Sequence, residues 1–203
     1  MKRCIIVGKA NVGKTLFLIA LAESLRVKEI SIIFETPDGK KMSSTLRIED
    51  AVNRLVGVRH HLTRCLQSVI LDLPAGKGRK EIEFIDTTGL SDGIHHDSDL
   101  RKSMAQTLAA LRSAHMILHI LDAADIGRGE NPLATGGVDR EICDFARFRC
   151  SYCIIANKMD LPEAEKGLEK IIHYAPPGGK VFPVSALKRQ GLTEVKRYVT
   201  SQI

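Results

Sequence analysis

The residues with the clearest chemical potential form one glycine-rich stretch near the N-terminus, Gly8–Thr15. Its sequence, GKANVGKT, follows the apolar run Cys4–Val7 and precedes an apolar helical pattern, Leu16–Leu25. Glycines allow a backbone to curve so that several N–H groups point at phosphate oxygens, and the start of the following helix adds free donors and partial positive charge. We interpret the stretch as a phosphate-binding loop.

Two side chains at the end of this loop have types that suit the same task. Lys14 would interact with the outer phosphates as a point charge, and the hydroxyl of Thr15 would be a ligand of Mg²⁺. The other loop residues that we predict to contact a nucleotide are Gly8, Ala10, Asn11, Val12, Gly13 and Leu16. The alternative interpretation is a glycine turn that begins an ordinary helix, which needs neither the lysine nor the threonine.

Three further polar stretches follow apolar runs that we expect to be strands. The stretches are Asp86-Thr87-Thr88-Gly89, Asn157-Lys158-Met159-Asp160 and Ser185-Ala186-Leu187, and the runs before them are 81–85, 152–156 and 181–184. Parallel strands of an open α/β sheet bring their carboxyl ends to one edge, and ligands bind there. We therefore expect these stretches to lie beside the phosphate-binding loop.

The second of these stretches contains a carboxylate that would select the base of a nucleotide. Asp160 can accept hydrogen bonds from both the N1–H and the 2-amino group of guanine. Adenine has no such pair of donors, so its binding would leave the carboxylate facing an acceptor, at a considerable free-energy cost. Asp160 therefore favours GTP and GDP as ligands over ATP, which stays a distant alternative.

Apolar runs and helical patterns alternate along most of the chain, which is typical of a mostly parallel sheet covered on both faces. We expect helices at 100–113, 138–148, 163–173 and 192–200, and a glycine-rich loop at 125–137. The runs 66–73 and 81–85, joined by a basic, glycine-rich linker, predict one antiparallel hairpin. The prediction is therefore an α/β fold of three layers. It has one domain over residues 1–203, one antiparallel strand in the sheet and helices on both faces.

Residues 28–60 contain an additional hairpin and helix. Ile30–Phe34 and Ser44–Ile48 are typical of strands, and the turn Thr36–Lys40 between them contains an Asp-Gly pair, a hairpin signal. Glu49–Val56 has a helical pattern. Two interpretations stay open, a surface that recognises a partner and an edge hairpin without a role of its own.

Taken together, the four motifs resemble those of small P-loop GTPases of the translation-factor-related (TRAFAC) class, in particular its Era/TrmE-like branch, from about Lys2 to Val199. The resemblance implies a Ras-like G domain that hydrolyses GTP to GDP and phosphate as a Mg²⁺-dependent switch. It implies that Asp86 holds Mg²⁺ through water, that the Gly89 N–H meets the γ-phosphate and that the Ala186 N–H meets guanine O6. The implied guanine-binding residues are Asn157, Lys158, Asp160, Ser185, Ala186 and Leu187.

A threonine of the first switch region completes the Mg²⁺ ligands in that branch. The branch usually has T-T-R or V-T-R just before the second strand, and this chain has Leu62-Thr63-Arg64 there. We therefore predict that Thr63 is the switch threonine, with Ser43–Thr45, nearer the usual distance from Lys14, as the alternative. With Thr63, residues 28–60 become an insertion in the first switch region, and the catalytic residues are Lys14, Thr63 and Gly89.

Two positions bear on how the reaction would be accelerated. Leu90 follows Gly89, where Ras-like relatives have a glutamine that orients the attacking water, and an apolar side chain cannot do so. Asn11 lies where potassium-activated relatives have an asparagine that helps to bind K⁺, an ion that would act electrostatically like an arginine finger. The alternative for Asn11 is a loop asparagine that only stabilises the backbone.

The resemblance leaves two hypotheses about function. In the first, the chain is a GTPase that is slow alone and is accelerated by K⁺, by a partner or by nucleotide-dependent homodimerisation. In the second, it is a GTP-binding interaction module with little turnover, and Leu90 permits this reading. The partner would be an unknown protein or ribonucleoprotein effector, and a ribosomal role rests on analogy alone.

Composition sets limits on location and partners. The formal net charge is +6 over 203 residues and aromatic residues are 4%, with the basic residues scattered in pairs. This pattern favours a solvated surface and is weak support for nucleic-acid binding, although ribosomal RNA stays an alternative. The sequence contains no run of 18 apolar residues, so we expect no transmembrane helix. The first expected strand follows Met1-Lys2-Arg3 directly, so we expect no cleavable signal peptide. We therefore expect a cytoplasmic protein.

Cysteine and histidine residues give weaker signals. Cys4 and Cys153 lie in apolar runs and are expected to be buried thiols, and we interpret the pair Cys150 and Cys153 as structural and not metal-binding. His95-His96 with nearby acids is expected to be a solvated loop, with a metal site as the alternative. His119 lies inside an apolar run and is expected to be a satisfied core histidine.

Overall fold

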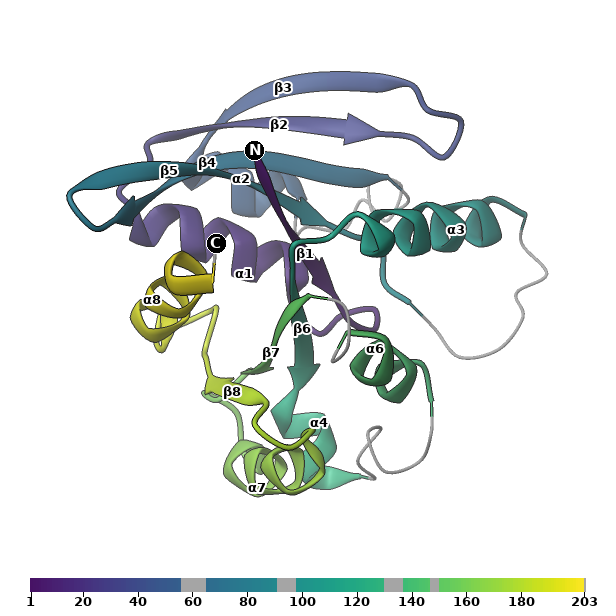
Figure 1. Cartoon of the computed structure of the whole chain (residues 1–203), viewed down its shortest axis with the longest axis vertical. Helices are drawn as coiled ribbons and strands as arrows, with labels where there is room; N and C mark the ends of the chain where they lie inside the picture. The colour runs from purple at the N-terminus through teal and green to yellow at the C-terminus, as the bar shows by residue number, and fades with distance from the viewer. Residues whose placement is uncertain (56–64, 91–97, 130–136, 147–149, 203) are drawn as a thin grey trace.

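The computed structural model describes residues 1–55, 65–90, 98–129, 137–146 and 150–202. Eight described strands form one sheet in the order β3-β2-β4-β5-β1-β6-β7-β8 (Figure 1). The strands are β1 (Lys2–Val7), β2 (Glu29–Glu35), β3 (Lys41–Arg47), β4 (Leu66–Ala75), β5 (Gly78–Asp86), β6 (Met116–Asp122), β7 (Ser151–Asn157) and β8 (Lys180–Pro183). The helices are α1 (Lys14–Ser24), α2 (Ile48–Leu55), α3 (Ser98–Arg112), α4 (Ala123–Arg128), α6 (Val138–Ala146), α7 (Ala164–Tyr174) and α8 (Leu192–Gln202).

The parallel part of the sheet consists of β5, β1, β6, β7 and β8. Its central strand, β1, is apolar at successive positions because both of its faces are buried. Ile6 packs with side chains of α1, α2 and α8, whereas Ile5 packs with those of α3, α4, α6 and α7. The predicted three-layer fold with helices on both faces is therefore confirmed.

The other part of the sheet is antiparallel. β4 runs antiparallel to β5 and β2 antiparallel to β4, so β2 has the same direction as the parallel strands. β3 is antiparallel to β2 and forms the outer edge. β4 is the antiparallel strand that the sequence predicts, and the additional hairpin supplies β3 as a second one.

In the described residues, the additional hairpin packs on α1 and α2 with one face, and α3 reaches only the end of β2 from the other side. Ile30, Ile32 and Phe34 of β2 are buried in the same core as α1 and α2. Ile33 of β2 and Ile70 of β4 point to the other face, where they are 37% and 48% exposed. The alternation of buried and exposed residues in β2 is the pattern of a strand with one solvated face.

The predicted hairpin and helix within residues 28–60 are confirmed over the part that the structure describes. Seven residues of β2 pair with seven of β3, from Glu29 opposite Arg47 to Glu35 opposite Lys41. The turn is closed by the hydrogen bond from Gly39 N–H to Thr36 O, and Gly39 has a φ of 83°. Residues 56–64 lie outside the described residues.

Three predicted boundaries differ from the structure. The strand predicted at Ser44–Ile48 is β3, which runs from Lys41 to Arg47, and Ile48 is the first residue of α2. β4 and β5 extend along the linker until Ala75 pairs with Gly78, because Gly76 adopts a φ of 58° and allows a tight turn. The predicted glycine-rich loop at 125–137 begins instead inside a helix, α4. The carboxylate of Asp122 accepts a hydrogen bond from Asp125 N–H at 3.0 Å and caps this helix.

All five cysteines are free thiols. Cys4 and Cys153 are buried as predicted, and burial raises the pKa of both thiols. A raised pKa disfavours the thiolate, which is the form that reacts and binds metals. None of the helices in the described residues combines the length and hydrophobicity needed to cross a bilayer.

Candidate functional site

The phosphate-binding loop has a backbone that only glycine can follow at two points. Gly8 and Gly13 have φ values of 143° and 96°. A Cβ atom on Gly8 would lie 2.3 Å from the carbonyl oxygen of Ile120, and one on Gly13 would lie 2.5 Å from Nδ2 of Asn157. The loop is therefore packed directly against the ends of β6 and β7, as a short curved connection between β1 and α1 requires.

Lys14 is bent back over its own loop. Its Nζ atom donates to the carbonyl oxygens of Gly8 at 3.2 Å and Lys9 at 2.8 Å. Burial lowers the pKa of this ammonium group, and the nearby carboxylates of Asp86 and Asp139 oppose that effect. The charged group thus lies at the centre of the loop, where it can exchange carbonyl partners for phosphate oxygens.

Thr15 and Asp86 form the second polar pair of the site. The Thr15 hydroxyl donates to Oδ2 of Asp86 at 2.5 Å. The other carboxylate oxygen, Oδ1, is buried and has no hydrogen-bond partner among the described residues. Burial raises the pKa of Asp86 to about 6, against the opposing effects of Lys14 and the Thr15 hydroxyl. A hydroxyl beside a buried carboxylate with an unsatisfied oxygen fits Mg²⁺, which prefers oxygen ligands.

The segment after Asp86 lies against the phosphate-binding loop. Leu90 N–H donates to Gly8 O at 3.2 Å, and Leu90 forms an isolated parallel bridge with Lys9. A Cβ atom on Gly89 would lie 2.7 Å from Ala10 N, so only glycine allows this approach. The Leu90 side chain is 1% exposed and packs in the core. It is therefore directed away from the solvent from which an attacking water would come.

The two threonines between Asp86 and Gly89 anchor this segment. The Thr87 hydroxyl donates to Ile6 O of β1 at 2.8 Å. The Thr88 and Thr107 hydroxyls lie 3.2 Å apart and connect the segment to α3. Both threonines are buried, so these hydrogen bonds satisfy groups that would otherwise destabilise the fold.

Asn157 connects two loops. Its Nδ2 atom donates to Val12 O at 2.9 Å, and its Oδ1 atom accepts from Ala186 N–H at 3.1 Å. The side chain is buried. One amide therefore joins the phosphate-binding loop to the Ser185–Leu187 loop, which comes from the far end of the sequence.

Asp160 and Ser185 are paired at the same edge. The Ser185 hydroxyl donates to Oδ1 of Asp160 at 2.5 Å and accepts from Lys188 N–H at 3.0 Å. The other carboxylate oxygen of Asp160, Oδ2, forms no hydrogen bond with a described residue. The Asp160 side chain is half-buried. Asp160 is thus oriented and still open to a ligand.

Arg189 fixes the backbone of this loop. Its guanidinium donates to Ala186 O at 3.0 Å and Leu187 O at 2.9 Å, and it pairs with Glu23 of α1. With these carbonyls held by Arg189, the peptide from Ser185 to Leu187 is fixed in direction. Arg189 belongs to no recognised motif, and only its place three residues after Ala186 could have indicated this role.

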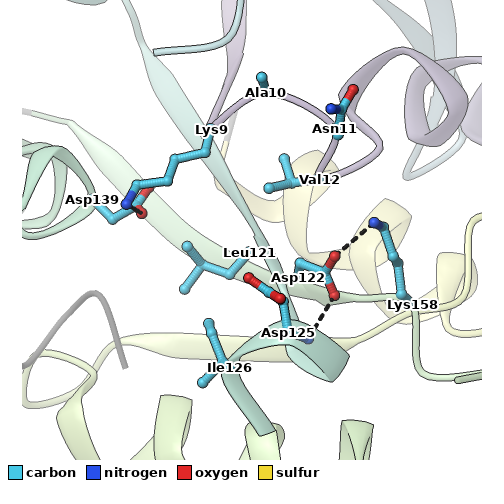
Figure 2. Close-up of a pocket in the computed structure, with 10 residues that line it drawn as sticks. All are labelled: Lys9, Ala10, Asn11, Val12, Leu121, Asp122, Asp125, Ile126, Asp139 and Lys158. Atoms are coloured by element: carbon cyan, nitrogen blue, oxygen red, sulfur yellow. Dashed lines mark hydrogen bonds and ion pairs between the residues drawn. The ribbon is translucent and has the colours of Figure 1, made fainter. Parts of the chain in front are cut away.

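Lys158 lies over a cavity of about 480 Å³ beside the phosphate-binding loop. Its Nζ atom pairs with Oδ2 of Asp122 at 2.6 Å, and its backbone has a φ of 66°. Figure 2 shows the pair of Lys158 and Asp122 on one side of the cavity and the Lys9 side chain directed to Asp139 on the other. The Asn11 side chain points away from both pairs. Asp122 thus caps α4 and holds Lys158 with the same carboxylate.

A buried polar chain reaches this cavity from the core. His119 is fully buried, and its ring nitrogens lie 2.9 Å from the Tyr152 hydroxyl and 2.9 Å from Oδ1 of Asp139. The other oxygen of Asp139 is 3.7 Å from Nζ of Lys9. The expectation of a satisfied core histidine is confirmed, and its connection to the phosphate-binding loop was not predicted.

The structure brings the described site residues that the sequence predicts to one edge of the sheet. Ala10 and Asn11 are exposed at the tip of the loop. Thr63 lies outside the described residues, as do His95 and His96, so their predicted roles stay predictions. The described residues contain no cluster of three or more histidine, cysteine or acidic side chains that would hold a metal ion without a nucleotide.

Fold and site together define a small P-loop GTPase of the TRAFAC class. Residues 3–158 match the model of the 50S ribosome-binding GTPase family. The chain belongs to that family.

Curated relatives agree with this assignment. GTPase Era of Heliobacterium modesticaldum is 25% identical over 98% of this chain and 54% of its own length. GTPase Obg of Shouchella clausii is 25% identical over 79% of this chain and 37% of its own length. The chain therefore spans only about a third to a half of these two relatives.

Two solved structures share the fold. One is an Era variant from Aquifex aeolicus bound to GDP and AlF₄⁻, with 21% identity, a TM-score of 0.63 and coverage of 100% of this chain and 57% of that chain. The other is Era in complex with MgGDPNP and a segment of 16S ribosomal RNA, with 22% identity, a TM-score of 0.63 and coverage of 99% and 56%.

Proposed function

We propose that the chain binds GTP and hydrolyses it to GDP and phosphate as a molecular switch. The observation that carries the proposal is the double hydrogen bond of Asn157 to Val12 and Ala186, at 2.9 Å and 3.1 Å. It holds a loop suited to phosphates and a loop suited to guanine at a fixed separation, as one nucleotide with a base and a phosphate chain requires.

In this proposal Lys14 and the N–H groups from Gly8 to Leu16 bind the phosphate chain at the start of α1. Thr15 and Asp86 hold Mg²⁺, which would neutralise charge on the β- and γ-phosphates. The Gly89 N–H meets the γ-phosphate, and its position against Ala10 supports this role. Water attacks the γ-phosphorus as the bond to the leaving GDP oxygen breaks, and Lys14 and the loop N–H groups stabilise the developing charge.

Thr63 would complete the Mg²⁺ ligands when GTP is bound. The alternative residues, Ser43–Thr45, lie in the regular strand β3 at the outer edge of the sheet, and the Thr45 hydroxyl lies 3.1 Å from that of Ser31. Serines and threonines held in a paired strand would have to leave it to reach Lys14. This geometry supports Thr63, and with it an insertion at 28–60 in the first switch region of one G domain over residues 1–203.

Guanine would be recognised between Asn157–Asp160 and Ser185–Leu187. The open oxygen of Asp160 would accept from the base, and the stem of Lys158 would cover one side of the ring. The Ala186 N–H, which donates to Asn157 Oδ1 in this structure, would be shared with guanine O6 as a three-centre hydrogen bond. Asp160→Asn tests this directly. Xanthine carries a carbonyl where guanine has its 2-amino group, so the variant should lose GTP affinity and gain xanthosine triphosphate affinity; an unchanged preference would sink the guanine assignment.

The reaction is slow without an activator in this proposal, because the buried Leu90 cannot orient water. Acceleration would come from K⁺ near Asn11, from a protein or ribonucleoprotein effector in the cytoplasm, or from a nucleotide-dependent homodimer. Asn11 has a φ of 63° and an exposed side chain at the tip of the loop, which supports a contact made from outside the cavity.

Turnover of GTP by the purified chain in KCl and in NaCl, with Asn11→Ala beside it, tests the activity and its activator together. Stimulation by K⁺ that disappears in the variant supports a potassium-activated switch. Equal slow turnover in both salts removes the role of K⁺ and leaves activation by a partner. Bound GTP without multiple-turnover phosphate release supports the alternative, a GTP-binding interaction module.

A further inference from the structure

A second cavity lies at the opposite end of the strands from the proposed nucleotide site. It is a groove of about 630 Å³ between the turn that joins β4 to β5 and the helix α8, which lie on the same side of the molecule in Figure 1. The turn is at the amino end of β5, whereas Asp86 is at its carboxyl end. The groove therefore opens at the edge of the sheet opposite to the phosphate-binding loop. Its lining residues are Pro74, Ala75, Gly76, Lys80, Thr193, Lys196, Arg197, Thr200 and Ser201.

The charged residues that line the groove are all cationic. Lys196 donates from Nζ to Ser24 O at 3.1 Å, at the C-terminal end of α1. Lys80 and Arg197 have no hydrogen-bond or ion-pair partner among the described residues. Acidic residues are adjacent in sequence at Glu81 and Glu194, but neither lines the groove. Two cations thus face the same space without local neutralisation.

The uncharged polar residues of the groove lie along α8. They run from Thr193 in the first turn to Ser201 in the last, a distance of about 12 Å along a helix axis. Thr200 and Ser201 donate their hydroxyl protons to carbonyls of their own helix, and the Ser201 oxygen also accepts from Gln202 Nε2 at 3.4 Å, so neither hydroxyl is a donor for a ligand. The donors for a ligand are therefore Lys80, Arg197, the Thr193 hydroxyl and the N–H bonds of Lys196 that Ser24 O does not use.

The surroundings of the groove restrict what it would bind. The large exposed apolar residues in the described part of the chain lie elsewhere, so neither a membrane nor a peptide with apolar anchors finds a contact in the groove. Among the described residues no aromatic side chain lines the groove, so unpaired bases find no stacking surface there. A ligand that presents repeated phosphates and little else matches this chemistry.

We propose that this groove binds the phosphate backbone of a nucleic acid without reading its sequence. Arginine and lysine neutralise backbone phosphates, and the affinity that they give falls steeply with salt. The proposal does not depend on the GTP site, because the two lie at opposite edges of the sheet and share no residue.

The test is the fluorescence anisotropy of a short labelled RNA duplex titrated with the full chain, with a DNA duplex of the same sequence in parallel. The variant K80Q/R197Q removes the two unpaired cations. The control K166Q/R112Q removes one lysine and one arginine from α7 and α3, outside the groove. We expect the groove variant to bind about tenfold more weakly and its plot of log affinity against log salt to be shallower by about 2, since each phosphate contact contributes roughly 0.9 to the slope. The control should match the wild-type protein.

The proposal is overturned if the control loses as much affinity as the groove variant, because the binding would then be diffuse. It is also overturned if polyglutamate competes with RNA as well as unlabelled duplex does at equal charge, because the site would then accept acidic peptides. Equal affinity for RNA and DNA is expected, and a preference that depends on bases would contradict a backbone site. GTP affinity and the midpoint of unfolding should be unchanged in K80Q/R197Q and in K166Q/R112Q. A change in either quantity would reveal a folding defect and distinguish it from a loss of the RNA site.

Discussion

Asn157 and Val12 are 145 residues apart in sequence, and the Asn157 amide donates to the Val12 carbonyl at 2.9 Å. The same side chain accepts from Ala186 N–H, so both loops depend on one buried amide. Asn157→Ala should lower the free energy of unfolding by about 2 kcal/mol, since it leaves two backbone groups without their partner. It should also weaken GTP binding, because the two loops would no longer be held together.

Chemical denaturation and nucleotide titration of Asn157→Ala provide the measurements, and Asn53→Ala is the control, because Asn53 is exposed on α2. The control should stay close to the wild-type protein in both. Full GTP affinity in a clearly destabilised Asn157→Ala protein would show that the amide supports the fold and not the nucleotide site.

Asp86 should make the metal-free protein less stable as the pH rises. Burial raises the pKa of this carboxyl from 3.8 to about 6, so it binds a proton more tightly in the folded chain than in the unfolded one. Its stabilising contribution is complete below about pH 4 and is lost as the pH passes about 6, a change of roughly 3 kcal/mol for two pKa units. Asp86→Asn should remove this decline.

Urea denaturation at several pH values, in the presence of a chelator, measures the Asp86 effect. Asp72→Asn, at an exposed position of β4, is the control and should follow the wild-type profile. A wild-type protein whose stability relative to Asp86→Asn does not fall between about pH 4 and pH 7 would contradict the raised pKa.

Asp139 should contribute more to stability than other acidic residues of α6. It is buried between His119 and Lys9, so Asp139→Ala leaves a buried histidine nitrogen without a partner. We expect a loss of roughly 3 kcal/mol in the free energy of unfolding. Asp139→Asn keeps a hydrogen-bonding group beside His119 and should lose less.

Asp144→Ala is the matched control in the same helix, because Asp144 is half-exposed and pairs with Arg140 on the surface. Such exposed pairs contribute at most about 1 kcal/mol. If Asp139→Ala and Asp144→Ala are equally stable, the buried chain from Tyr152 to Lys9 has no structural importance. A separate fall in GTP affinity in Asp139→Asn would indicate that Asp139 also positions the phosphate-binding loop.

The positions of the motifs were predictable because each follows an apolar run, and the carboxyl ends of parallel strands share one edge. The partners of individual side chains were not. The pairing of Asn157 with Asp122 across β6 and β7 sets where Lys158 and Asp122 meet, and a one-residue change of register would separate them. Such registers depend on packing over the whole sheet.

The missed helix α4 has a different cause. Gly127 and Gly129 favour a loop by composition, but a Cβ atom on Gly127 would lie 1.9 Å from Glu163 O. The glycine is there because α4 and α7 approach closely, and the helix is maintained by that packing and by the Asp122 cap. A single sequence does not reveal which of the two reasons a glycine serves, since both require the absence of a side chain.

Gln106 should couple the additional hairpin to α3. Its Nε2 atom donates to Glu35 O at 3.1 Å and to Thr36 O at 3.2 Å, where β2 ends. α3 follows the segment of Gly89, which is proposed to meet the γ-phosphate, so a shift of that segment would reach the hairpin through Gln106. Gln106→Ala should therefore speed amide hydrogen exchange at the Thr36–Lys40 turn and make it independent of the bound nucleotide.

Hydrogen exchange followed by mass spectrometry, with GDP and with a non-hydrolysable GTP analogue, measures this coupling. Leu108→Ala is the control, because Leu108 lies on the same helix and is 55% exposed. Nucleotide-dependent exchange at the turn that persists in Gln106→Ala would mean that another contact carries the coupling. Exchange that is identical for both nucleotides in the wild-type chain would instead favour an edge hairpin without a switching role. The expected pattern, a difference in wild type and in Leu108→Ala that is absent in Gln106→Ala, would make the hairpin a nucleotide-sensitive surface for partner recognition.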